Sequence, residues 1–90
     1  MSPRALAPDP EMLAVQALGF LAEDTGRLTR FLDITGISPA TLRQAAQSPT
    51  FLASVLAYLM ADESLLLAFA AQVQVRPETL APAEAALSRR

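Results

Sequence analysis

The chain has 90 residues, 52% of them hydrophobic and 18% charged, and its formal net charge is −2. This length suits one domain with a modest core, and the hydrophobic content excludes disorder as a description of the whole chain. The chain has no Cys and no His, which excludes disulfides and thiolate chemistry and removes the commonest general base and metal ligand. All basic residues are Arg, and the negative net charge disfavours nucleic-acid binding through phosphate contacts.

The N-terminal residues and the longest apolar stretch indicate whether the chain is exported or inserted into a membrane. Residues 1–8 contain no apolar stretch of signal-peptide length, so we expect a cytoplasmic protein. We also expect these residues to form a flexible tail before a single helical domain at residues 9–90. Residues 51–73 are long enough to span a bilayer, but Asp62 and Glu63 would lie near its middle. A central Asp costs roughly 2.5–3.5 kcal/mol on insertion scales. We therefore expect residues 51–73 to form a helical hairpin in a soluble domain and not a membrane span.

The residue pattern predicts an all-α protein, because Ala and Leu dominate and no run alternates β-branched with polar residues. Three helix starts are marked by a capping residue followed by Pro, at Asp9-Pro10, Ser38-Pro39 and Ser48-Pro49. Helices are predicted at residues 10–22, 25–35, 39–46 and 49–61, from residue 63 onward, and from a turn at Pro77 to about residue 88.

Two glycines and one proline refine the predictions for three of these helices. Gly36 follows the helix at 25–35, where a left-handed residue is wanted. Gly19 costs about 1 kcal/mol relative to Ala inside a helix, which a close helix crossing would explain. Pro82 in the last segment predicts a break, because Pro in a helix interior costs roughly 3 kcal/mol.

The most hydrophobic stretch, residues 51–75, predicts two core helices joined at Asp62, which the rest of the chain covers. The first has a bulky apolar face and a face of small residues, and the second is apolar nearly all round. The apolar surface of these two helices is larger than the core of one small domain obviously requires. Other segments of the chain, a symmetric copy or a protein partner must therefore cover it. The candidate interaction surface consists of Ala53, Ala57, Leu67, Ala70 and Ala71. Leu67 and Ala71 in particular are expected to be buried.

Residues 27–47 resemble a helix-turn-helix, with Gly36 in the turn. In the DNA-binding form of that motif the second helix presents polar side chains to base edges. The residues that would serve this alternative function are Arg27, Arg30, Thr41, Arg43 and Gln44. A generic connection between two helices explains the same pattern, and Leu32 stands where the motif usually has a small residue. We therefore favour the structural interpretation.

Two charged pairs have structural explanations as well. Asp62 and Glu63 are adjacent carboxylates, but one is a natural helix cap and the other lies in the first turn, where the helix dipole favours negative charge. Arg27 and Arg30 form a short basic stripe that would suit an anion or an acidic partner. Acidic residues close by in the sequence favour a mixed, solvated face. No catalytic, cofactor or metal site is predicted.

The segments LGFLAED, RLTRFLDITGISPATLRQAA and SPTFLASVLAYLMADESLLLAFAA together resemble a family of small bacterial proteins known as domain of unknown function 3572. The resemblance covers residues 11–87. It implies a helical fold and a bacterial cytoplasmic setting, and it carries no function and no catalytic residue. We therefore expect a non-enzymatic helical module that acts through protein contacts, as a homodimer or an adaptor, with DNA binding as the alternative.

Overall fold

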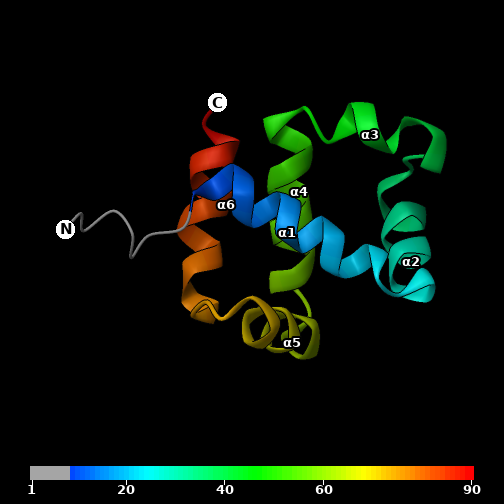
Figure 1. Ribbon diagram of the computed structural model, residues 1–90. Helices are drawn as coiled ribbons and strands as arrows, with labels where there is room; N and C mark the ends of the chain where they lie inside the picture. Colours follow the sequence, from blue (N-terminus) through cyan, green and yellow to red (C-terminus); the bar gives the residue numbers. More distant parts are fainter. Residues whose placement is uncertain (1–8) are drawn as a thin grey trace.

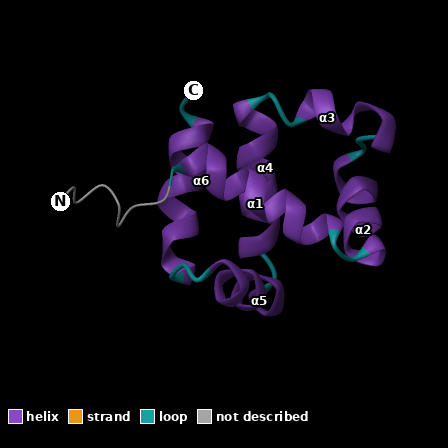
Figure 2. Ribbon diagram, in the orientation of Figure 1, coloured by secondary structure: helices purple, strands orange, loops and turns teal. Residues whose placement is uncertain are grey.

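The computed structural model describes residues 9–90, and all regular structure in this part of the chain is helical (Figure 2). The predicted all-α fold is confirmed. The tail predicted at residues 1–8 lies outside the described residues.

The elements follow the predicted order. They are α1 (Pro10–Ala22), α2 (Thr25–Thr35), the 3-10 turn η2 (Pro39–Thr41), α3 (Leu42–Ala45), α4 (Pro49–Met60), α5 (Glu63–Val73), the 3-10 turn η3 (Pro77–Thr79) and α6 (Leu80–Ser88). The main difference lies at residues 39–46, where one predicted helix is a 3-10 turn followed by a single α-helical turn. A second difference concerns Pro82. It is the third residue of α6, where a backbone N–H has no partner within the helix, so the predicted break is absent.

Side-chain caps fix most of the helix starts. Asp9, Asp24 and Asp62 each accept a hydrogen bond from the backbone N–H three residues on, at 3.0–3.2 Å. Ser48 does the same for α4 at a longer 3.4 Å. At the other end of α2, Gly36 adopts the left-handed conformation with φ 76°, as predicted.

The helix α4 lies at the centre of the fold. It packs side by side with α6, while α1 runs across both and continues toward α2 (Figure 1). One core joins these helices, and its fully buried members include Leu13 and Leu21 of α1, Leu56 and Leu59 of α4, and Leu87 of α6. At the rim, Arg90 Nη1 lies 2.8 Å from Glu11 Oε2 and joins the end of the chain to the start of α1.

The helix α5 lies across one end of α4, near the start of α6 (Figure 1). The predicted α4–α5 pair is present, but it turns through 110° at the break, so the two helices are not antiparallel. No single helix in residues 9–90 has the length and composition to cross a bilayer, and this bent pair meets those criteria only when both halves are counted together.

The helix α2 lies on the side of α4 away from α6 and is attached through aromatic side chains (Figure 1). Phe31 makes edge contacts with Phe51 and Tyr58 of α4, with centroids 5.8 and 5.1 Å apart. Phe20 of α1 makes a similar contact with Phe69 of α5 at 5.6 Å. Such pairs contribute about 0.5–1.5 kcal/mol beyond the area they bury.

Candidate interaction surfaces

The predicted interaction surface on α4 and α5 divides into an inner and an outer part. Ala53 and Ala70 are buried within the chain, each 4% exposed. Ala57 and Ala71 are exposed, and Leu67 is 50% exposed. Within residues 9–90, therefore, no segment covers Leu67 and Ala71. Because α5 crosses only the end of α4, a single face of α5 is turned inward.

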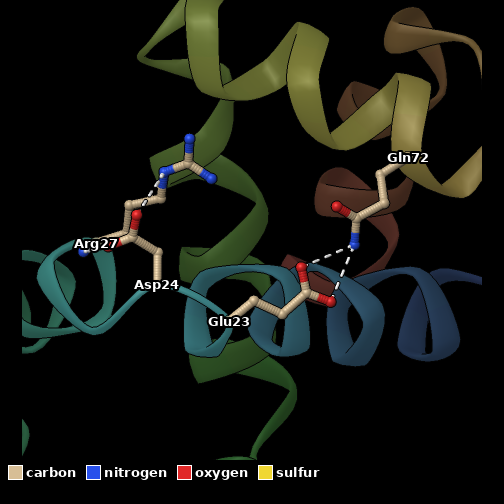
Figure 3. Close-up of polar contacts among 4 residues, drawn as sticks. All are labelled: Glu23, Asp24, Arg27 and Gln72. Atoms are coloured by element: carbon tan, nitrogen blue, oxygen red, sulfur yellow. Dashed lines mark hydrogen bonds and ion pairs between the residues drawn. The ribbon is translucent and has the colours of Figure 1, made fainter.

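A polar contact fixes α5 against the end of α1. The side-chain amide of Gln72 donates to both carboxylate oxygens of Glu23 at 3.1 Å, and these residues are 49 positions apart in the sequence (Figure 3). This bond lies beside the exposed apolar residues of α5. The outer face of α5 is consequently a mixture of small, apolar and polar side chains.

The outer face of α1 is more uniformly apolar, and sequence reasoning did not assign it to any site. Met12 is 62% exposed and Val15 is 52% exposed, and Gly19 and Ala22 follow on the same side of the helix. These positions are spaced by three or four residues, so they form one stripe along α1. We call these four residues the α1 stripe. The signal was present in the sequence, because residues 12–22 contain no charged residue.

An open apolar hollow adjoins the α1 stripe. It has a volume of about 480 Å³ and lies between α1 and the η2–α3 segment. Its lining residues are Val15, Leu18, Gly19, Ala22, Pro39, Leu42, Arg43 and Ala46. Arg43 is the only charged residue among them. Stripe and hollow together form a continuous apolar surface bordered by one cation.

Gly19 has no packing role inside the described part of the chain. A Cβ atom placed on it would meet no atom within 4 Å, and the residue is exposed. The close crossing predicted at Gly19 is therefore not a crossing with another helix in residues 9–90. No contact within residues 9–90 therefore offsets the cost of about 1 kcal/mol that Gly carries in a helix interior.

The residues of the helix-turn-helix alternative do not converge on one surface. Arg27 and Arg30 line a hollow near the end of α4, whereas Arg43 lines the hollow against α1. The Thr41 hydroxyl donates to the Ser38 carbonyl oxygen at 3.1 Å. The helix α3 has only four residues, which is about 6 Å of helix. The α2–α3 segment thus presents no extended recognition helix.

The two carboxylates at the start of α5 occupy their predicted structural positions. Asp62 caps the helix through Leu65 N–H at 3.2 Å, and Glu63 is exposed in the first turn. No group of three or more His, Cys, Asp or Glu side chains gathers for a metal ion within residues 9–90. Arg27 and Arg30 share a hollow with Tyr58 and Asp62.

Comparison with known proteins gives a family and no function. The sequence model of a family described as protein of unknown function (DUF3572) matches residues 7–90. Neither the curated proteins nor the solved structures contain a match to the chain.

Proposed function

The chain belongs to the DUF3572 family, whose description assigns no function, and we propose that it is a non-enzymatic protein-interaction module. The partner element is a helix of another protein chain that crosses α1 at Gly19, and a second copy of this chain is the first partner to test. The observation that carries the proposal is Gly19, an exposed glycine inside α1. A Cβ atom placed on it would meet no atom of another element within 4 Å among residues 9–90.

Helix packing explains why a glycine supports an interaction here. Side chains set the distance between two crossing helices, and a residue without a side chain lets the backbones approach closely. Met12 and Val15 on one side of Gly19 and the hollow on the other would supply apolar contact area. Arg43 at the edge of the hollow would give the contact a preferred orientation toward an acidic side chain.

The outer face of α5 is a weaker candidate for the same role. Leu67 is exposed there, but it lies among Glu63, Ser64 and Gln72, and it lines neither the hollow beside α1 nor the one around Arg27 and Arg30. We therefore assign the contact to the α1 stripe and use Leu67 as the control.

The test compares Gly19→Leu with Leu67→Gln by light scattering and sedimentation equilibrium. We expect the unaltered chain and Leu67→Gln to dimerise equally and Gly19→Leu to weaken the dimer by at least about tenfold, because the new side chain separates the helices. If the chain is a monomer, the same variants are compared for their ability to retain a protein partner purified from the native cell. Equal association of Gly19→Leu and the unaltered chain in both assays contradicts the proposal.

Gly19→Ala provides the matched stability control. Because an added Cβ meets no other element within 4 Å in residues 9–90, this change should raise the unfolding free energy of the monomer by about 1 kcal/mol. Urea denaturation at low protein concentration measures it. A loss of stability would mean that Gly19 serves the fold of the chain itself and would remove the argument for an external contact.

A further inference from the structure

A hollow separate from the α1 stripe lies where the start of α2 faces the end of α4 and the start of α5. Its volume is about 340 Å³, and Gly26, Arg27, Arg30, Tyr58, Asp62 and Leu65 line it. We call it the arginine hollow. Its size lies at the lower end of the range for small-molecule sites, and its lining combines two guanidinium groups, a phenol and a carboxylate.

Arg27 is held in place by its own surroundings. Its Nε lies 3.9 Å from Asp24 Oδ2 (Figure 3). Its Cζ lies 5.0 Å from the centroid of the Phe20 ring. These contacts occupy one edge and one face of the guanidinium group. Its two terminal nitrogens make no hydrogen bond within residues 9–90. They are an oriented pair of donors.

Arg30 and Tyr58 add further donors that the described chain does not use. Arg30 takes part in none of the ion pairs among residues 9–90. The Tyr58 ring is fixed by its edge contact with Phe31, and its hydroxyl makes no hydrogen bond in the same part of the chain. Guanidinium groups match carboxylate geometry with paired N–H donors, and a phenol can add a further hydrogen bond.

Asp62 decides which anions suit the hollow. One of its carboxylate oxygens, Oδ1, accepts the capping bond from Leu65 N–H, and the other makes no hydrogen bond within residues 9–90. The negative charge of Asp62 opposes a compact dianion such as phosphate. A ligand that carries a hydrogen-bond donor can bind the free carboxylate oxygen of Asp62, and Asp62 then favours binding.

We propose that the arginine hollow binds a small carboxylic acid that also carries a hydroxyl or amino donor. The ligand carboxylate lies against Arg27 and Arg30 and accepts the Tyr58 hydroxyl, while its donor bonds Asp62. The groups come from three helices, so the site exists only in the folded chain. It is independent of the α1 stripe, because the two share no residue.

The test is an NMR titration of the amide signals of the full chain with glycolate, acetate and inorganic phosphate at constant ionic strength. Glycolate carries the carboxylate and the donor, acetate carries only the carboxylate, and phosphate carries a larger negative charge. We expect saturable shifts for glycolate at residues 26–30 and 62–65. Acetate should bind about three- to tenfold more weakly, which corresponds to the loss of one hydrogen bond. Phosphate should also bind more weakly than glycolate, because the charge of Asp62 repels its larger negative charge.

Four variants separate the contributions. Arg30→Gln should weaken glycolate at least about tenfold, since a charge-assisted bond is lost. Tyr58→Phe keeps the ring and removes only the hydroxyl, and Asp62→Asn keeps a good capping residue while removing the charged acceptor. Arg89→Gln changes an exposed arginine that lines neither the arginine hollow nor the hollow beside α1, and it should leave the affinity unchanged.

The possible results divide cleanly. Glycolate shifts that saturate in the unaltered chain and in Arg89→Gln but weaken in Arg30→Gln support the site. Shifts spread over the whole surface, or equal in Arg30→Gln, overturn it. Tighter binding of phosphate than of glycolate, or equal binding of glycolate and acetate, overturns the assignment of the ligand class.

Discussion

Gln74 is the only residue other than Gly with a positive φ in residues 9–90, and it closes α5 at φ 59°. A left-handed conformation costs roughly 1–2 kcal/mol for a residue with a Cβ, whereas glycine adopts it freely. Gln74→Gly should therefore raise the unfolding free energy by about 0.5–1 kcal/mol, after the larger entropy of glycine in the unfolded chain is subtracted. Thermal and urea denaturation measure this change. Gly36→Ala, at φ 76° and with open space around it, is the matched change and should have the opposite sign.

The same two positions show what a single residue reveals in the sequence. Gly36 predicted the end of α2 correctly, because glycine is the usual residue at a left-handed helix end. Gln74 gave no comparable signal, since glutamine is a good helix former and its conformation here follows from the chain turning back toward η3. A residue type therefore predicts a left-handed helix end only when that residue type favours the left-handed conformation, as glycine does.

Capping separates two helix starts that look alike in the sequence. Asp9-Pro10 and Ser38-Pro39 both carry a capping residue before Pro, but only the Asp9 side chain accepts a capping hydrogen bond, from Met12 N–H at 3.0 Å. Asp9→Ala should lower the unfolding free energy by about 1 kcal/mol, and Ser38→Ala by less than half of that. Asp9→Asn retains the acceptor and serves as the control. Chemical denaturation of the three variants measures the difference, and equal losses at both sites would contradict the observed caps.

The helix starts were predictable because capping and proline act locally, and the expected starts at residues 10, 25, 49 and 63 are confirmed. The split of residues 39–46 was not predictable. Ser38 bonds side chain to side chain with Thr41 at 3.3 Å instead of capping, and the first turn is a 3-10 turn. This choice between two hydrogen-bonding patterns depends on how the connection from α2 meets α1 and α4.

At the scale of the molecule, the helices were predictable and their outer faces were not. The helix α1 is apolar on both sides, so periodicity alone does not tell which side the core takes. Leu13 and Ala17 are buried, while Met12 and Val15, their neighbours in the sequence, lie outside. The α1 stripe and the arginine hollow both arise from contacts between helices distant in the sequence. The uncharged sequence of α1 indicated an apolar outer face, but only the packing of α4 against α1, α2, α5 and α6 shows which side of α1 stays exposed and where the arginine hollow forms.

The small-residue face of α4 tests that packing directly. Ala53 is buried and Ala57, one turn later, is exposed, although the sequence placed both on one interaction surface. Ala53→Leu adds methylene groups to a filled core and should lower the unfolding free energy by about 1–3 kcal/mol. Ala57→Leu makes the same change in solvent and should alter it by less than about 0.5 kcal/mol. Urea denaturation of both variants measures the contrast. If Ala57→Leu proved as damaging as Ala53→Leu, the exposed half of this face would have to be covered, either by this chain or by a second copy.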